Sequence, residues 1–451
     1  FPPVPFDLPL DAASLTQERA HRTGRLVWAG QGGNEVCRSV LPGGVRVITE
    51  RMPGQRSVAV GYWVGVGSRD ERPGMLGSTH FLEHLLFKGT RTRSALDIAQ
   101  AFDAVGGESN ALTAKEHTCY YAHVLGEDAP MAAEVIADMT AAAVLDPREM
   151  EQERGVILEE LAMDQDDPMD VAFERFTGQV MGEHPLGRPI GGTPEEIRAV
   201  ARDAVAEHYR RHYTPDRLVV SAAGNLEHGE FVGRVQRALT EAGWDLSDAA
   251  ALPAARRVRR PAALSPLLGT ETVRRDVEQA HVLVGSTGLI AGHEQRFAMS
   301  VLNAALGGGM SSRLFQEIRE RRGLAYSTFS YAGSFSDAGY FGLYAGCAPA
   351  KAEQVRALMR SELERLAEHG IGEAELAKVA GQLGGSTVLG SEDVASRMFR
   401  LGRSELDTGR FLPLDELLAE LRAVTAEQVQ ALAADLAERP TVITLVMPSG
   451  A

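Results

Sequence analysis

The stretch MLGSTHFLEHLLF, residues 75–87, places two histidines and a glutamate together in an apolar segment. Its apolar residues recur at helical spacing, so a helix is predicted here. Residues four positions apart lie on one face of a helix, and His80 and His84 can therefore direct ring nitrogens to one metal ion. Glu83 lies three positions after His80 and next to His84, where its carboxylate can act as a general base. This His-x-x-Glu-His order is the inverted zinc signature, the mirror of H-E-x-x-H.

A surface helix with two hydrogen-bonded histidines is the alternative interpretation of this motif. A catalytic zinc ion usually takes three protein ligands and a water, so a third ligand must come from elsewhere. The best candidate segment is the acidic helix predicted over residues 146–164, whose apolar stripe leaves some of its acids at the edge of the core. A buried acid there would need a metal or a cation. Helical spacing leaves the choice open among Glu149, Glu151, Glu153, Glu159 and Glu160.

The inverted signature, followed by ERGVILEE at residues 153–160, resembles the pitrilysin/insulinase family of zinc peptidases. The likeness is to its shorter members, the mitochondrial-processing-peptidase type and its bacterial relatives. The resemblance implies His80, His84 and Glu160 as ligands of one Zn2+ per chain, because the third ligand of the family lies 76 positions beyond the second histidine. It also implies Glu83 as the catalytic base and Glu153 as a support behind a ligating histidine.

The likeness continues through GGESNA at residues 106–111 and EHTCYY at residues 116–121, which resemble the substrate-binding edge strand of the family. An edge strand carries unpaired N–H and C=O groups, to which an extended peptide can add as another strand. The resemblance implies that Asn110 and Ala111 hold the substrate main chain near the metal. On the residues alone, a Gly-Gly turn leading into an ordinary hairpin is the simpler interpretation.

The second half of the chain contains an arginine and a tyrosine seven positions apart, Arg319 and Tyr326, that resemble a catalytic pair of the family. The resemblance implies that these side chains donate hydrogen bonds to the substrate carbonyl and to the developing oxyanion. Without it, Arg319 would be interpreted as part of an exposed salt bridge with Glu317 or Glu320.

The order of predicted strands and helices recurs roughly 220 residues later, which indicates a duplication. We expect an α+β fold with two homologous domains, each a mainly antiparallel sheet packed with helices. The second copy carries Arg296 and Phe297 where the histidines would be, and therefore cannot bind zinc. The resemblance implies that the chain forms half of a clamshell chamber. The predicted segments are an N-terminal arm or tail (1–35), a catalytic zinc-binding domain (36–247), a linker (248–268) and an inactive homologous domain that contributes substrate-binding residues (269–451).

The chain is acidic, with 61 acidic against 46 basic residues and a net charge of −15, which argues against a nucleic-acid partner. Asp170 and Glu174 form an i, i+4 pair, and we hypothesise that they bind a basic side chain of the substrate. A solvated acidic helix face is the alternative. The arginines at 256–260 are predicted to form a solvated linker or an intrachain salt-bridge strip. No apolar run of 18 residues is present, so no membrane insertion is expected.

The residues alone predict a metal hydrolase with a His-His-acid site. With the family resemblance, they predict a zinc-dependent endopeptidase that cleaves short or unfolded polypeptides in an enclosed chamber, with a preference for basic peptides. We expect a homodimer, because this one chain carries both the zinc ligands and the Arg319–Tyr326 pair. A heterodimer is the alternative. The rival functions are a catalytically silent structural or assembly subunit, and a catalytic subunit that requires a different partner chain. Three scattered cysteines and no signal peptide predict a cytoplasmic protein of bacterial type, or an organellar matrix protein if a presequence was removed.

Overall fold

The computed structural model describes residues 6–19 and 24–450. These residues form two compact units, and each unit has its own sheet and its own hydrophobic core. The chain passes from the first unit to the second within helix α5 (Pro147–Asp166) and returns near the end of helix α12 (Glu373–Gly390). Unit 1 takes its described residues from Phe1–Leu161, Pro189–Arg257 and Leu389–Pro413, and unit 2 takes them from Ala162–Arg188, Val258–Val388 and Leu414–Ala451.

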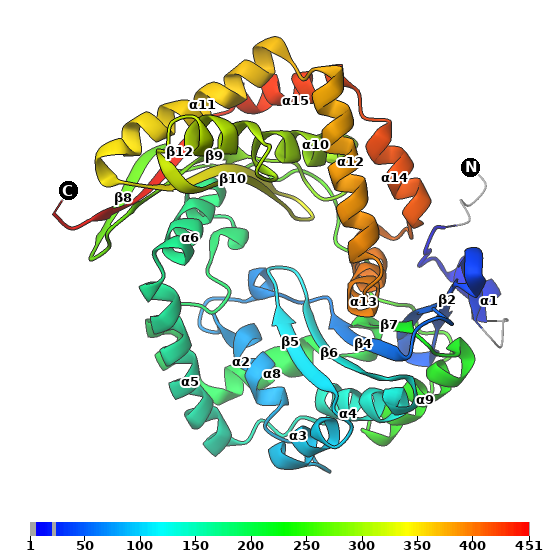
Figure 1. The fold of residues 1–451 in the computed structure, drawn as a ribbon. Coiled ribbons are helices and arrows are strands. Elements are labelled where there is room, and N and C mark those ends of the chain that lie inside the picture. Colours follow the sequence, from blue (N-terminus) through cyan, green and yellow to red (C-terminus); the bar gives the residue numbers. More distant parts are fainter. Residues whose placement is uncertain (1–5, 20–23, 451) are drawn as a thin grey trace. The chain divides into compact units, whose positions relative to one another are not determined.

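Unit 1 is built on a seven-stranded sheet (Figure 1). Its strands are β1 (Arg25–Ala29), β2 (Glu35–Val40), β3 (Arg46–Arg51), β4 (Ser57–Val64), β5 (Glu108–Thr113), β6 (Thr118–Leu125) and β7 (Leu218–Gly224). They are ordered β1-β2-β3-β7-β4-β6-β5, and all neighbours are antiparallel except β3 and β7. Strand β5 therefore lies at an edge of the sheet, as the resemblance to a substrate-binding edge strand predicted.

Helices cover both faces of this sheet. The helices of unit 1 are α1 (Ala12–Arg19), α2 (Ser78–Leu86), α3 (Ala95–Asp103), α4 (Ala129–Ala142), most of α5, α7 (Pro194–Ala199), α8 (Arg202–His212), α9 (His228–Glu241) and α13 (Val394–Arg403). Along β4, Val60 and Tyr62 join the larger core under α2, α4 and α9, whereas Trp63 packs with Met398 of α13 on the opposite face (Figure 1). This alternation is the period of two that a strand imposes on its side chains.

Unit 2 contains a five-stranded sheet of the same design. Its strands are β8 (Gly269–Arg275), β9 (Ala280–Thr287), β10 (Ala325–Ser334), β11 (Gly339–Cys347) and β12 (Val442–Pro448). They are ordered β10-β11-β9-β12-β8, with only β8 and β12 parallel. The helices of unit 2 are α6 (Pro168–Met181), α10 (Arg296–Gly307), α11 (Ala352–His369), most of α12, α14 (Leu414–Arg422) and α15 (Ala426–Glu438).

The strand orders confirm the predicted duplication. The order β3-β7-β4-β6-β5 in unit 1 matches β8-β12-β9-β11-β10 in unit 2, and in each unit the last strand of the sequence pairs parallel with the first of the set. Helix α10 follows β9 as α2 follows β4, so Arg296 begins the helix that corresponds to the histidine helix. The fold is α+β with two related domains.

Residues 1–35 were predicted to be an arm or a loose tail, and their described part, which excludes residues 1–5 and 20–23, packs as part of unit 1. Leu8 and Leu15 are fully buried, and β1 pairs with β2. The carboxylate of Glu18 lies 2.8 Å from the guanidinium of Arg38, and both side chains are buried. Charged residues that are buried as a pair do not add to an apolar pattern in the sequence. The packing of the N-terminal segment was therefore not evident from its hydrophobic periodicity.

Two segments belong to a different unit from the domain in which the sequence analysis placed them, because the predicted domains were continuous in sequence. Residues 162–188, placed in the 36–247 domain, join unit 2, because Phe176 of α6 packs against Leu283 of β9. Residues 389–413, placed in the 269–451 domain, join unit 1, because Met398 of α13 packs on its sheet. An amphipathic helix shows in its sequence that one face is covered, but not which sheet covers it.

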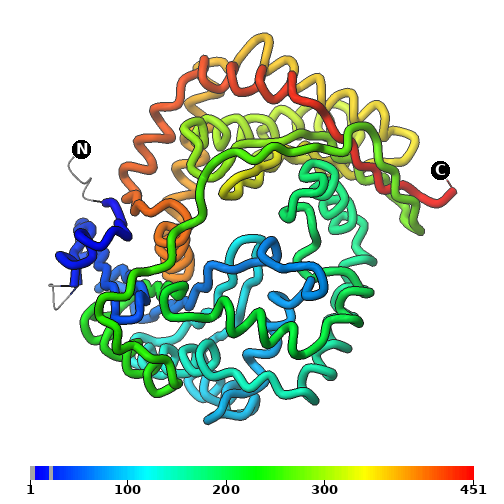
Figure 2. The backbone as a smooth tube through the Cα atoms, turned by 180° about the vertical axis from the view of Figure 1, so that it is seen from behind, coloured from blue at the N-terminus to red at the C-terminus, as the bar shows by residue number. Residues whose placement is uncertain are grey.

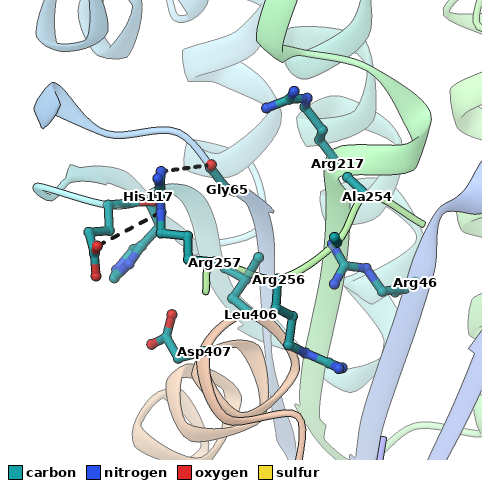
Figure 3. A pocket seen from close by; sticks show the side chains of 11 residues that line it. Arg46, Gly65, His117, Arg217, Ala254, Arg256, Arg257, Leu406 and Asp407 are labelled. Carbon is teal, nitrogen blue, oxygen red and sulfur yellow. Dashed lines mark hydrogen bonds and ion pairs between the residues drawn. The ribbon is translucent and has the colours of Figure 1, made fainter. Parts of the chain in front are cut away.

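Residues 248–268 contain no helix or strand, as expected of a linker (Figure 2). Arg256 donates to the carboxylate of Glu405 at 2.8 Å, and Arg257 donates to Asp70 at 2.9 Å. Both arginines line a cavity of about 60 Å³ within unit 1 (Figure 3). These contacts confirm the intrachain salt-bridge interpretation for the two residues. Among the described residues, no helix has the length and apolar character needed to cross a membrane.

Candidate metal centre

Helix α2 carries the histidine motif beside its buried apolar face. Phe81, Leu82, Leu85 and Leu86 of this helix are buried in the large core of unit 1. This apolar face anchors the helix, so His80, Glu83 and His84 project from its remaining surface. The predicted helix is confirmed.

Helix α5 provides the acidic residues. Its buried residues Met150, Glu153, Ile157 and Leu161 follow helical spacing, so Glu153 belongs to the stripe that faces the core. Glu160 lies beside this stripe, and its side chain is 46% exposed. The helix therefore presents one buried and one partly exposed carboxylate toward α2.

The structure brings His80, His84 and Glu160 together. The Nε2 atoms of His80 and His84 lie 3.6 and 3.3 Å from Oε2 of Glu160. One ligand atom from each of the three residues lies within 4.8 Å of the others, and no other such group of His, Cys, Asp or Glu occurs in the described part of the chain. Tetrahedral zinc with bonds of about 2.0–2.1 Å separates its ligands by about 3.3 Å. The donor set and its spacing therefore fit zinc.

Glu153 lies behind His84. Its Oε2 is 3.0 Å from Nδ1 of His84, and its Oε1 is 2.7 Å from Nζ of Lys88. A carboxylate at Nδ1 keeps the proton on that nitrogen, which leaves the Nε2 lone pair available for a metal. Lys88 is not among the predicted site residues, although its position four residues after His84 matches the spacing of one helix face.

Glu83 contacts a residue of the edge strand. The hydroxyl of Thr113, the last residue of β5, donates to Oε2 of Glu83. Thr113 is buried, so this contact restricts the orientation of the carboxylate. Nothing in the local sequence of Thr113 indicated this contact, because it depends on how β5 packs against α2.

Asn110 and Ala111 lie on β5, three and two positions before Thr113, respectively. Asn110 is exposed and Ala111 is half-buried. The side chain Oδ1 of Asn110 accepts a hydrogen bond from the backbone N–H of Ala111 at 2.8 Å. Both residues are thus on the same edge strand as the group that contacts Glu83.

Arg319 and Tyr326 contact each other in unit 2. Nη1 of Arg319, in the π-helical turn Phe315–Glu320, donates to the backbone oxygen of Tyr326 at 3.0 Å. The guanidinium carbon lies 4.6 Å from the centre of the Tyr326 ring, a cation–π distance. Tyr326 is 76% exposed, which is unusual for a large aromatic side chain.

Asp170 and Glu174 lie on successive turns of α6 in unit 2. Asp170 is exposed on the first turn, after the N-cap residue Asp167. Desolvation raises the pKa of Asp170, and the neighbouring carboxylates of Asp167 and Asp164 raise it further. Asp170 therefore lies in the acidic first turn of α6, and Glu174 follows one turn later.

Comparisons with known proteins agree with this architecture. Residues 46–194 match the family described as Insulinase (Peptidase family M16), and residues 199–383 match the Peptidase M16 inactive domain. The chain therefore belongs to peptidase family M16, which contains the pitrilysin and insulinase type of protein.

Relatives of similar length carry the words "uncharacterized zinc protease" in their names. The protein from Streptomyces coelicolor is 48% identical and is matched over 95% of this chain and 93% of its own. That from Mycobacterium tuberculosis is 46% identical over 92% and 93%. A crystal structure of a protease from Helicobacter pylori has a TM-score of 0.83 at 22% identity and covers 92% of this chain and 100% of its own.

Proposed function

We propose that this protein is a zinc-dependent endopeptidase. The observation that carries the proposal is the convergence of His80, His84 and Glu160, with the carboxylate of Glu153 at 3.0 Å behind His84. The names of the M16 relatives support zinc and peptide-bond hydrolysis. A closed structural zinc site normally recruits four protein ligands, and three are found among the described residues, which favours a catalytic site.

Zinc held by His80, His84 and Glu160 would supply Lewis acidity, which polarises the scissile carbonyl and makes water more acidic. Glu83 accepts the proton of the attacking water and delivers it to the leaving amine nitrogen. The Thr113 hydroxyl holds Oε2 of Glu83, so Oε1 is the oxygen that receives the proton.

The substrate adds to the free edge of β5 in an extended conformation, held by Asn110 and Ala111. Strand addition needs a chain without its own structure, so short or unfolded polypeptides are the proposed substrates. Arg319 and Tyr326 donate hydrogen bonds to the substrate carbonyl, and Asp170 and Glu174 bind a basic side chain. The active form is a homodimer, because one chain carries both the metal ligands and the Arg319–Tyr326 pair.

The test compares the wild type with Glu83→Gln and Glu160→Gln, measuring zinc content and cleavage of a mixed peptide library. Glu83→Gln should retain zinc and lose cleavage, whereas Glu160→Gln should lose both. A wild type that binds zinc and cleaves nothing would refute a self-sufficient peptidase and favour a structural subunit or a chain that needs a different partner.

A further inference from the structure

The first turn of the histidine helix α2 is buried. Ser78 and Thr79 are fully buried, so water does not satisfy the N–H groups at this helix end. The first four N–H groups of any helix lack intrahelical partners and require acceptors from elsewhere. The helix begins after Gly77, which has no side chain to provide one.

A capping side chain at position 77 is excluded by the structure. Gly77 has a φ of +84°, a conformation that side-chain-bearing residues rarely adopt. A Cβ at this position would lie only 2.4 Å from Cδ1 of Ile197. The usual Ser, Thr, Asp or Asn cap is therefore unavailable, and the acceptor must come from another part of the chain.

Glu71 supplies the missing acceptors. Its Oε2 accepts from the N–H of Gly77 at 2.8 Å, and its Oε1 accepts from the N–H of Thr79 at 2.7 Å. The N–H between them, that of Ser78, donates to the carbonyl of Met75 at 3.2 Å. Glu71 is 5% exposed, and a negative charge is favourable at the positive end of a helix.

His80 directly follows this turn. The turn is also held from the other side, because the Thr79 hydroxyl lies 3.0 Å from Nε2 of His208. His80 itself is 9% exposed, so its ring lies close to the buried end of the helix. The backbone position from which the His80 side chain projects is thus fixed by the contacts of Glu71 and His208 with the preceding residues.

We infer that Glu71 is a positioning residue of the metal centre: by holding the N–H groups of Gly77 and Thr79 with one carboxylate, it orients His80 for metal binding. This inference rests on the metal centre of the proposed function. It differs from ordinary helix capping, because it concerns metal affinity and not only stability.

The test is Glu71→Gln, which keeps the size of the side chain but leaves one acceptor oxygen for two N–H groups. We expect the Kd for zinc, measured by competition with a chromophoric chelator, to rise about 10-fold, as for other groups that orient a ligand. Glu71→Asp keeps the charge with a shorter reach and should give an intermediate loss. If Glu71→Gln does not fold, the zinc Kd of Glu71→Asp provides the test.

The matched control is Asp97→Asn. Asp97 accepts from the N–H of Ser94 at 2.8 Å and caps the nine-residue helix α3 of the same unit, which carries no metal ligand. This change should lower the Tm of the zinc-free chain and leave the zinc Kd unchanged. Equal zinc Kd values for wild type and both Glu71 variants would overturn the inference alone. A wild type that does not bind zinc would overturn the inference together with the proposed function.

Discussion

Replacing Glu153 tests whether the carboxylate behind His84 tunes the metal site. The side chain of Glu153 is 6% exposed and accepts from two donors, Nδ1 of His84 at 3.0 Å and Nζ of Lys88 at 2.7 Å. Glu153→Gln keeps the shape and one acceptor oxygen, but it removes the negative charge that both donors use. Glu153→Ala removes both hydrogen bonds.

The magnitude follows from these contacts. A hydrogen bond to a charged group contributes about 1.5–3 kcal/mol, and about 1.4 kcal/mol corresponds to a tenfold change in an equilibrium constant. Lys88 is 34% exposed, so water replaces part of its lost partner. We therefore expect the zinc Kd to rise about 10-fold for Glu153→Gln and about 100-fold for Glu153→Ala, the range seen for such partners of ligating histidines.

The assay is chelator competition for zinc at constant pH, together with the Tm of each zinc-free protein. Glu159→Gln is the matched control, because Glu159 is an exposed acid on the same helix. Its zinc Kd should equal that of the wild type. Unchanged zinc Kd values for both Glu153 variants, with folding intact, would refute the assignment of Glu153 as a support for His84.

Three further predictions concern other parts of the chain. Burial lowers the pKa of His228 to about 4, below the value of about 6.5 in an unfolded chain. As the pH falls, the unfolded chain therefore binds this proton first, and stability that is complete above about pH 6.5 is lost towards pH 4. His228→Asn should flatten the dependence of Tm on pH in the zinc-free protein; an unchanged slope would contradict this. Thr113→Val removes the hydrogen bond to Glu83. It should raise the activation free energy by about 1.4 kcal/mol and so reduce kcat about 10-fold, with zinc content unchanged. An unaltered kcat would show that Thr113 does not orient the base. Asp170→Ala should reduce cleavage of an arginine peptide relative to its alanine counterpart, and an unaltered ratio would reject the acidic pair as a specificity element.

The histidine helix and the repeated strand order were predictable because both depend on local patterns. The spacing of His80 and His84 places them on one helix face whatever the helix packs against. The third ligand was not predictable from periodicity, because helical spacing left five glutamates of the 146–164 helix as candidates. Only the resemblance to the M16 family singled out Glu160, whose Oε2 lies 3.6 and 3.3 Å from Nε2 of the two histidines.

The remaining features depend on tertiary contacts that leave no local signal. Thr113 and Glu83 are 30 residues apart, and their contact follows from the packing of the edge strand against α2. The buried pair of Arg38 and Glu405 joins residues 367 positions apart and ties the segment 389–413 to unit 1. Charged residues are ordinarily expected at the surface, so the sequence favours an exposed interpretation of both.

We propose above that this chain binds catalytic zinc through His80, His84 and Glu160. The most direct measurement is zinc per chain, with peptide cleavage before and after zinc addition, for wild type, Glu160→Gln and Glu159→Gln. We predict about one zinc ion per chain and zinc-dependent cleavage for wild type and Glu159→Gln, and neither for Glu160→Gln, because catalytic zinc usually takes three protein ligands. Full zinc content and cleavage in Glu160→Gln would show that Glu160 is not a zinc ligand.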